Sequence, residues 1–441
     1  MFSNRDLRNL LIPLIIEQVL TSLMGIFDTL MVSNVGSEAI SGVSLVDSIN
    51  KLLIYMFSAL TTGGTIVCAQ YLGCKDKKSS DDAAQQMIFS SFLLSVIFTI
   101  VCVIFRSGLL SVIYGTVSPG VMEASEQYFF ITAFTYPLLA LFYAGSALYR
   151  AARNSKLPMI ISVISNVINV VGNAILIFVF HMGVRGAAVS TLISCAFSAV
   201  FIMILLKRPG QPVDIGTPWT FRINMPMIKR VMTVGIPNGI ENAMFQFGKL
   251  VVQSTVSTLG TAAMAANAIV ISLELMTSIP SMAIGIGLTT VAGQCMGAGK
   301  PDEARFYTRK LTIWALVVMI FVNWGIMALT PLVTKLGGLT DEVAEMTIFV
   351  MLVISIIKPF LWPSAFVPAY GMRAAGDVKY GLIVTTVSMW VFRVGLTTIL
   401  CRFCGVGLIG IWCGYFVDWG VRGICFITRF RGDKWTKHHV I

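Results

Sequence analysis

Long apolar runs, each ended by a short polar or charged turn, form the main pattern of this chain. A run such as "FLLSVIFTIVCVIF" does not alternate between apolar and polar positions, as a transmembrane β-strand would. The runs have roughly 20 residues, which is enough for a helix to cross a bilayer. Because a backbone in lipid must satisfy its own hydrogen bonds, the pattern predicts membrane-spanning α-helices.

Turn-rich or charged breaks, such as "GCKDKKSSDD" and "GTVSPG", separate the runs. We therefore expect an all-α polytopic membrane protein with twelve transmembrane helices. Their approximate ranges are 7–33, 43–72, 83–105, 124–150, 157–180, 184–206, 228–258, 263–296, 305–330, 343–372, 379–401 and 406–428.

The first half of the chain recurs, in degenerate form, in the second half. Glu17 of "IPLIIEQ" corresponds to Glu241 of "GIPNGIEN", and Arg150 of "YRAARNSK" corresponds to Arg373 of "MRAAGDVK" at almost the same spacing along the chain. A constant offset over this length indicates two copies of one long unit, an architecture typical of secondary transporters. The sequence predicts two pseudo-symmetric six-helix lobes: an N-terminal lobe over 1–206, a cytoplasmic linker over 207–227 and a C-terminal lobe over 228–441.

Composition and charge agree with this picture. The chain is 56% hydrophobic and 12% charged, whereas soluble domains are about 25% charged. At one set of helix ends we count 23 Lys and Arg, against four at the other: Arg106, Arg185, Lys335 and Arg402. Basic loops stay in the cytoplasm, so both termini are expected there, in a multi-pass protein of the plasma (inner) membrane. The net charge of +11 thereby follows from topology and indicates no nucleic-acid partner.

Several segments, in this order, resemble the multidrug and toxic compound extrusion (MATE) exporters of the multidrug/oligosaccharidyl-lipid/polysaccharide superfamily. They are "GIFDTLMVSNVG", the helix ends "AQYLG" and "GQCMGAG", and the paired turns "RAARNSK" and "RAAGDVK". The resemblance extends from about residue 7 to "GDKW" at 432–435. It implies an antiporter that exchanges a cation for a small organic compound.

Charged residues inside membrane helices are costly, so each is a functional candidate. Asp28 of "GIFDTLMV" shares one helix face with Glu17 and Thr21, because 11 residues at 100° each return close to the starting direction. The resemblance implies that Asp28 binds the coupling H⁺ or Na⁺. The alternative is that Asp28 only bonds neighbouring helices.

Asn166, Asn169 and Asn173 of "SNVINVVGNAIL" repeat at i, i+3 and i+7, which predicts a polar stripe on the fifth helix. Their amides could complete a cation site or hold Asp28, or they could only pack helices. Many relatives have a second aspartate where this chain has Asn173, so a Na⁺ site made of two acids is less favoured here than H⁺. The resemblance adds Thr191 and Ser146 to this network.

Acids in both lobes are candidates for lining a substrate cavity. Glu17 and Glu241 each follow a proline by four residues, so they could attract an organic cation or cap backbone freed by the proline. Glu274 is a third candidate. Four methionines could adapt to varied ligands: Met24, Met244, Met276 and Met282. The tenth helix contains Pro359, Pro363 and Pro368, which predict a hinge.

Other charges in the spans have less certain roles. Asp418 and Arg422 are four residues apart, which predicts an ion pair on one helix, and Arg393 is expected to be structural. Lys249 and Lys358 could partner Glu241, Glu274 or Glu17, and the sequence does not settle their roles.

The function predicted from these features is a cation-coupled (H⁺ or Na⁺) antiporter that exports amphipathic, cationic drug-like or toxic compounds by alternating access. The alternative is a lipid-linked oligosaccharide flippase of the same superfamily. An enzyme is not expected, because no HExxH, GxSxG or Walker A motif occurs. We expect a monomer in contact with membrane lipids that needs no cofactor beyond its coupling ion and no metal, except Na⁺ if it binds at Asp28.

Overall fold

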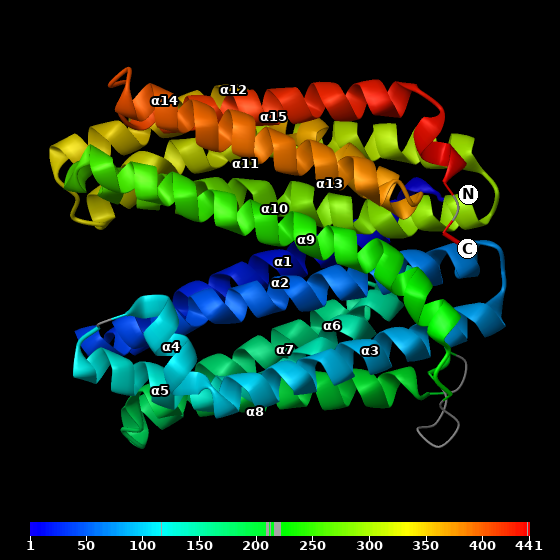
Figure 1. Ribbon diagram of the computed structural model, residues 1–441, viewed down its shortest axis with the longest axis horizontal. Helices are drawn as coiled ribbons and strands as arrows, with labels where there is room; N and C mark the ends of the chain where they lie inside the picture. The colour runs from blue at the N-terminus through cyan, green and yellow to red at the C-terminus, as the bar shows by residue number, and fades with distance from the viewer. Residues whose placement is uncertain (116, 209–210, 212, 216–221, 439) are drawn as a thin grey trace. The chain divides into compact units, whose positions relative to one another are not determined.

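The computed structural model describes residues 1–115, 117–208, 211, 213–215, 222–438 and 440–441, and all regular elements within them are helices (Figure 1). The chain forms two compact units. The first contains Phe2–Gly239, and the second contains Met1 and Ile240–Ile441. Helix α9 (Met225–Val256) contributes residues to both. The lobe boundaries expected from the sequence, with a linker over 207–227, stay a prediction, and part of that linker lies outside the described residues.

The first unit is drawn from blue to green in Figure 1. It consists of α1 (Asn4–Ser33), α2 (Ser37–Gly73), α3 (Lys77–Ile104), α4 (Arg106–Tyr114), α5 (Pro119–Ala133), α6 (Thr135–Ala151), α7 (Lys156–Asn173), a π-helical segment (Ala174–Val179), α8 (Gly183–Leu206) and the start of α9.

The second unit continues with the rest of α9, a 3₁₀ turn (Ser257–Leu259), α10 (Thr261–Gly297), α11 (Pro301–Leu336) and α12 (Asp341–Ala374). It ends with α13 (Val378–Val387), a π-helical segment (Ser388–Leu396), α14 (Thr397–Arg402), α15 (Leu408–Arg431) and a 3₁₀ turn (Lys434–Lys437).

Nine helical stretches in the described part of the chain are long and apolar enough to cross a membrane, and the bent pair α5 and α6 adds a tenth. Helices α9 and α15 complete the expected twelve, and they are less apolar because they contain charged residues such as Lys249 and Asp418. Large apolar side chains lie exposed along the spans, for example Ile97, Phe321 and Ile383. Their exposure suits contact with lipid rather than water. The prediction of an all-α polytopic membrane protein is therefore confirmed.

The helices in the structure differ from those predicted from the sequence in two places. A short helix, α4, forms where none was predicted. The predicted fourth helix, 124–150, is two helices, α5 and α6, which meet at a 45° bend around Phe134. The bend has a local cause, since the ring of Pro137 cannot fit against the carbonyl of Ala133 in a regular helix.

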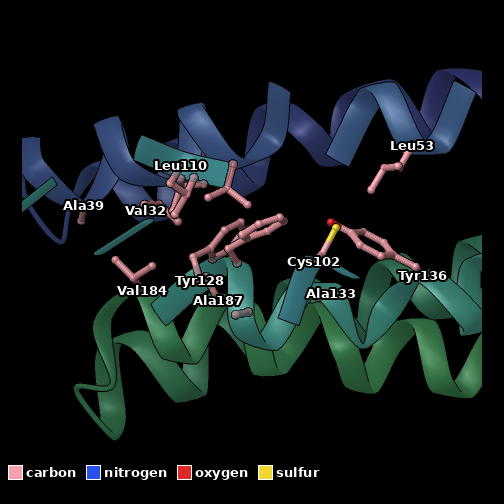
Figure 2. Packing of buried hydrophobic residues seen from close by; sticks show 14 of the residues in the cluster. Val32, Ala39, Leu53, Cys102, Leu110, Tyr128, Ala133, Tyr136, Val184 and Ala187 are labelled. Carbon is pink, nitrogen blue, oxygen red and sulfur yellow. The ribbon is translucent and has the colours of Figure 1, made fainter. Parts of the chain in front are cut away.

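Residues of α1, α2, α3, α4, α5, α6, the π-helical segment Ala174–Val179 and α8 form the hydrophobic core of the first unit (Figure 2). Fully buried aromatic side chains fill it, among them Phe57, Phe129 and Tyr136. The rings of Phe57 and Tyr136 are 6.3 Å apart between centroids. This packing fixes α2 against α6 and supports the neighbouring helices that carry the polar residues described next.

Candidate ion-coupling and substrate sites

Asp28 on α1 contacts the polar stripe of α7. Its Oδ1 atom accepts a hydrogen bond from Nδ2 of Asn173 at 2.6 Å. Asp28 is half-buried, whereas Asn173 is fully buried at the last position of α7. A carboxylate that accepts a charge-assisted hydrogen bond across two helices ties α1 to α7.

The stripe continues from α7 to α8. Asn173 Nδ2 also donates to Oδ1 of Asn169 at 3.1 Å, and Asn169 Nδ2 donates to Oγ1 of Thr191 at 3.2 Å. On α8, Ser190 donates to the carbonyl of Asn169 at 2.8 Å. A chain of hydrogen bonds thus connects Asp28 on α1, through Asn173 and Asn169 on α7, with Thr191 on α8.

Among the residues predicted for this site, three buried polar atoms have no hydrogen-bond partner: Oδ1 of Asn173, Oγ of Ser146 and Nδ2 of Asn166. A buried polar atom without a partner is unfavourable unless water or an ion satisfies it. The Asp28 carboxylate and the Asn173 amide oxygen are the kind of oxygen ligands that a small hard cation takes. Thr21 differs from the other predicted members, because it is exposed and its hydroxyl donates to the Glu17 carbonyl at 2.9 Å.

The repeated acids Glu17 and Glu241 make equivalent ion pairs in the two units. Oε1 of Glu17 lies 3.3 Å from Nη1 of Arg150, and Oε1 of Glu241 lies 2.7 Å from Nη2 of Arg373. Glu241 also accepts a 3.0 Å hydrogen bond from Thr385, whereas Oε2 of Glu17 has no hydrogen-bond partner. Both acids are buried, and both partners come from the repeated "RAA" turn.

Glu274 on α10 pairs with Lys358 on α12. Their Oε1 and Nζ atoms are 2.5 Å apart, and Lys358 is fully buried. The ammonium group also donates to three more oxygens, those of the Glu274 carbonyl, Thr277 and Ser278. This settles the partner of Lys358, which the sequence left open.

Asp418 on α15 lies between two arginines. Its Oδ1 is 2.7 Å from Nε of Arg422, which confirms the predicted i, i+4 pair, and its Oδ2 contacts Nη2 of Arg393. Ser388 donates to Oδ1 at 2.5 Å. Arg393 and Ser388 lie in the π-helical segment Ser388–Leu396. Sequence reasoning missed this centre because Arg393 and Asp418 lie on different helices, and no spacing rule relates them.

The remaining predicted residues are four methionines and three prolines. The four methionines are each half-buried: Met24, Met244, Met276 and Met282. The prolines at 359, 363 and 368 lie within one continuous helix, α12. The three residues therefore interrupt no helix in this structure, and a hinge there stays a prediction about motion.

The first unit also has an open cavity of about 550 Å³, lined by residues 35–39 at the start of α2, 120–127 at the start of α5 and 181–184 at the start of α8. Its polar lining includes Glu38, Glu123 and His181. In the described residues no group of three His, Cys, Asp or Glu side chains is arranged to hold a metal ion. The cavity contains none of the predicted site residues.

Comparison with known proteins identifies the family. The MatE family model matches residues 13–175 and 237–399, one match in each copy of the repeat. The chain belongs to the MatE family. These two matches fall on the duplicated segments, with the same spacing that separates Glu17 from Glu241.

Among its relatives is the uncharacterized transporter YisQ of Bacillus subtilis, 25% identical over 96% of this chain and 93% of that protein. The probable multidrug resistance protein NorM of Thermotoga maritima is 24% identical over 99% and 94%. A solved structure, the outward-facing conformation of a multidrug resistance MATE family transporter of the MOP superfamily, matches with a TM-score of 0.91 and 21% identity. The match covers 97% of this chain and 94% of that one. The MatE family is a family of transporters, so this chain is a transporter and not an enzyme.

Proposed function

We propose that this protein exports amphipathic, drug-like compounds from the cell, organic cations among them, in exchange for H⁺ or Na⁺. The observation that carries the proposal is the contact of Asp28 with Asn173 and, through Asn169, with Thr191. The names of relatives, such as the Thermotoga maritima protein, support drug efflux as the activity. We place the protein in the plasma membrane with both termini in the cytoplasm, since its basic residues gather at one set of helix ends.

Asp28 is the proposed coupling residue. A half-buried carboxylate among apolar helices takes up a proton or pairs with a cation far more readily than one in water. Neutralising it weakens the charge-assisted hydrogen bond from Asn173. Loading with the ion thereby changes how strongly α1 is held to α7, and such a difference can favour one of two arrangements in an alternating-access cycle.

We favour H⁺ as the coupling ion. The site contains one carboxylate, Asp28, and the neighbouring stripe supplies neutral amides, Asn173 and Asn169. A proton needs one acid, whereas a dehydrated Na⁺ needs several oxygens to replace its water. Oδ1 of Asn173, which has no hydrogen-bond partner, could be one such ligand. The experiment therefore tests Na⁺ as the alternative coupling ion.

The test measures ethidium efflux by purified protein in liposomes, driven separately by a pH gradient and by a Na⁺ gradient. We expect wild-type efflux to follow the pH gradient, and Asp28→Asn to reduce it to the rate of empty liposomes. The amide keeps the shape of the side chain and removes its titration. The matched control is Asp302→Asn, an exposed aspartate in the first turn of α11, which should transport like the wild type.

Two outcomes would overturn the proposal. Undiminished efflux by a folded Asp28→Asn protein would show that Asp28 does not couple the ion. No movement of ethidium by the wild type under either gradient would contradict cation-coupled efflux itself. Monodisperse elution of each variant in detergent separates a loss of coupling from a loss of folding.

A further inference from the structure

Lys249 on α9 differs from Lys358, Arg393 and Arg422, the other basic residues that the sequence places inside the spans of the second unit. In the part of the chain that the structure describes, it forms no ion pair and its side chain is exposed. The acids predicted inside the spans of this unit already have basic partners: Glu241 with Arg373, Glu274 with Lys358, and Asp418 with Arg393 and Arg422. Among these described residues, an ammonium group on a membrane helix therefore has no acid of its own, which marks it as a functional candidate.

Helix α9 has three faces, and they show where Lys249 points. One face is buried, with Glu241 and Val252. A second face is exposed and apolar, with Ile240, Phe247 and Val251. The third face is polar and half-buried or exposed, and comprises Asn242, Gln246, Lys249 and Gln253. At about 100° per residue, the polar and apolar exposed faces are directed about 150° apart.

The apolar face suits lipid, and the polar face does not. Four polar residues at helical spacing over more than two turns indicate a wet surface, of the kind that lines a transport path. A lysine that simply reached the lipid headgroups would have no need of Asn242, Gln246 and Gln253 beside it.

The first copy of the repeat has the same three faces on α1. Its apolar exposed residues Ile16, Leu23 and Phe27 occupy the positions equivalent to Ile240, Phe247 and Val251 of α9. Its polar face carries Gln18, Ser22, Gly25 and Thr29, with Gly25 at the position of Lys249. Nothing in the described chain lies within 4 Å of a Cβ atom built on Gly25. The equivalent surface thus exists in both copies, and the second copy alone places a cation on it.

The surroundings of Lys249 strengthen its positive potential. Its Nζ atom lies 4.8 Å from the centre of the Phe245 ring. The guanidinium groups of Arg393 and Arg422 lie 5.0 Å and 5.4 Å from the same ring. Asp418 balances one of these three cations, so two positive charges remain next to an aromatic surface.

We propose that Lys249 binds an anionic group of the transported compound, with Phe245 against its apolar part. This inference rests on the proposed function. It adds to the proposed substrates a defined class, namely zwitterionic and anionic amphipaths that bear a carboxylate. Because Lys249 has no acid to release, it binds such a group without first breaking an ion pair of the protein. A charge-assisted hydrogen bond to an ammonium group then favours the carboxylate over its ester.

The test compares rhodamine B, which carries a cationic dye system and a carboxylate, with its ethyl ester, which lacks the negative charge. Efflux of each dye is measured in liposomes as a function of concentration. Lys249→Gln should raise the KM for rhodamine B about tenfold and leave the KM for the ester within about twofold. Lys249→Arg should behave like the wild type. The matched control is Lys335→Gln, an exposed lysine in the last turn of α11.

An equal effect of Lys249→Gln on both dyes, or no effect on either, would overturn the inference, since a structural or lipid-anchoring lysine does not distinguish a carboxylate from its ester. Binding of both dyes to detergent-purified protein, followed by fluorescence anisotropy, repeats the comparison without transport. If the wild type moves neither dye nor ethidium, the proposed efflux itself fails. If the wild type transports the ester and ethidium, but Lys249→Gln leaves the KM for rhodamine B unchanged, this inference alone fails.

Discussion

At the residue scale, Lys358 illustrates how a fully buried ammonium group is held in a membrane helix. Its Nζ atom lies within 2.8 Å of four oxygens, all of them from the segment 274–278 of α10. Its charge is balanced by Glu274. The sequence identifies Lys358 as an unusual charge. It could not identify the partner, because Glu274 is 84 residues away and the contact depends on the register between α10 and α12.

Replacing one member of this pair should therefore destabilise the folded protein more than replacing both. We expect Lys358→Met to destabilise the protein by about 3–5 kcal/mol, because the Glu274 carboxylate is left without its counter-charge. The double variant Lys358→Met with Glu274→Gln should recover a large part of that loss. Thermal unfolding of the purified variants in mild detergent measures this, with Lys335→Met as the control for losing an exposed lysine. A double variant less stable than Lys358→Met would contradict the account.

At the scale of elements, the helical spans follow from the apolar runs, whereas the deviations inside them do not. The two π-helical segments, Ala174–Val179 and Ser388–Leu396, come directly after the polar stripe of α7 and around Arg393. A π-helical turn contains one residue more than an α-helical turn, but it is made of the same apolar residues. The apolar pattern of the sequence therefore cannot predict it. The spacing of the asparagines predicts that they lie on one stripe, and Asn173 and Asn169 are hydrogen-bonded to each other. The contact of Asn173 with Asp28 could not be predicted in this way, because it joins residues 145 positions apart.

Close helix packing in the first unit gives a prediction at this scale. Gly63 on α2 faces the start of α9, and a Cβ atom at this position would lie 2.5 Å from the Val231 carbonyl oxygen. Gly63→Ala should lower the unfolding temperature, because backbone atoms cannot move aside as a side chain can. Gly325→Ala on α11 is the matched control, since its Cβ atom would meet nothing within 4 Å. It should raise stability slightly through helix propensity. Equal shifts for the two variants would show that the α2–α9 contact is not tight.

At the scale of the whole molecule, the duplication is visible both in sequence and in contacts. The offset between the copies aligns Glu17 with Glu241 and, one residue out of step, Arg150 with Arg373. The sequence could predict these equivalences but not that the members of each set meet, since the partners lie 133 and 132 residues apart. Each unit uses the pair to join its first long helix to the helix that ends in the "RAA" turn. An ion pair kept in both copies suggests a structural task common to both.

The two ion pairs differ in contact distance and in their additional hydrogen bonds. This difference predicts which of the two pairs contributes more to the stability of the protein. Glu241 has a 2.7 Å contact with Arg373 and a second hydrogen bond from Thr385, whereas Glu17 has a 3.3 Å contact with Arg150 and an Oε2 atom without a partner. Glu241→Gln should therefore lower stability by about 1.5–3 kcal/mol, and Glu17→Gln by clearly less. Thermal unfolding in detergent, read beside ethidium efflux, separates this role from cavity lining. If Glu17→Gln abolished efflux while leaving the unfolding temperature unchanged, Glu17 would act on the substrate or ion and not as half of a structural pair.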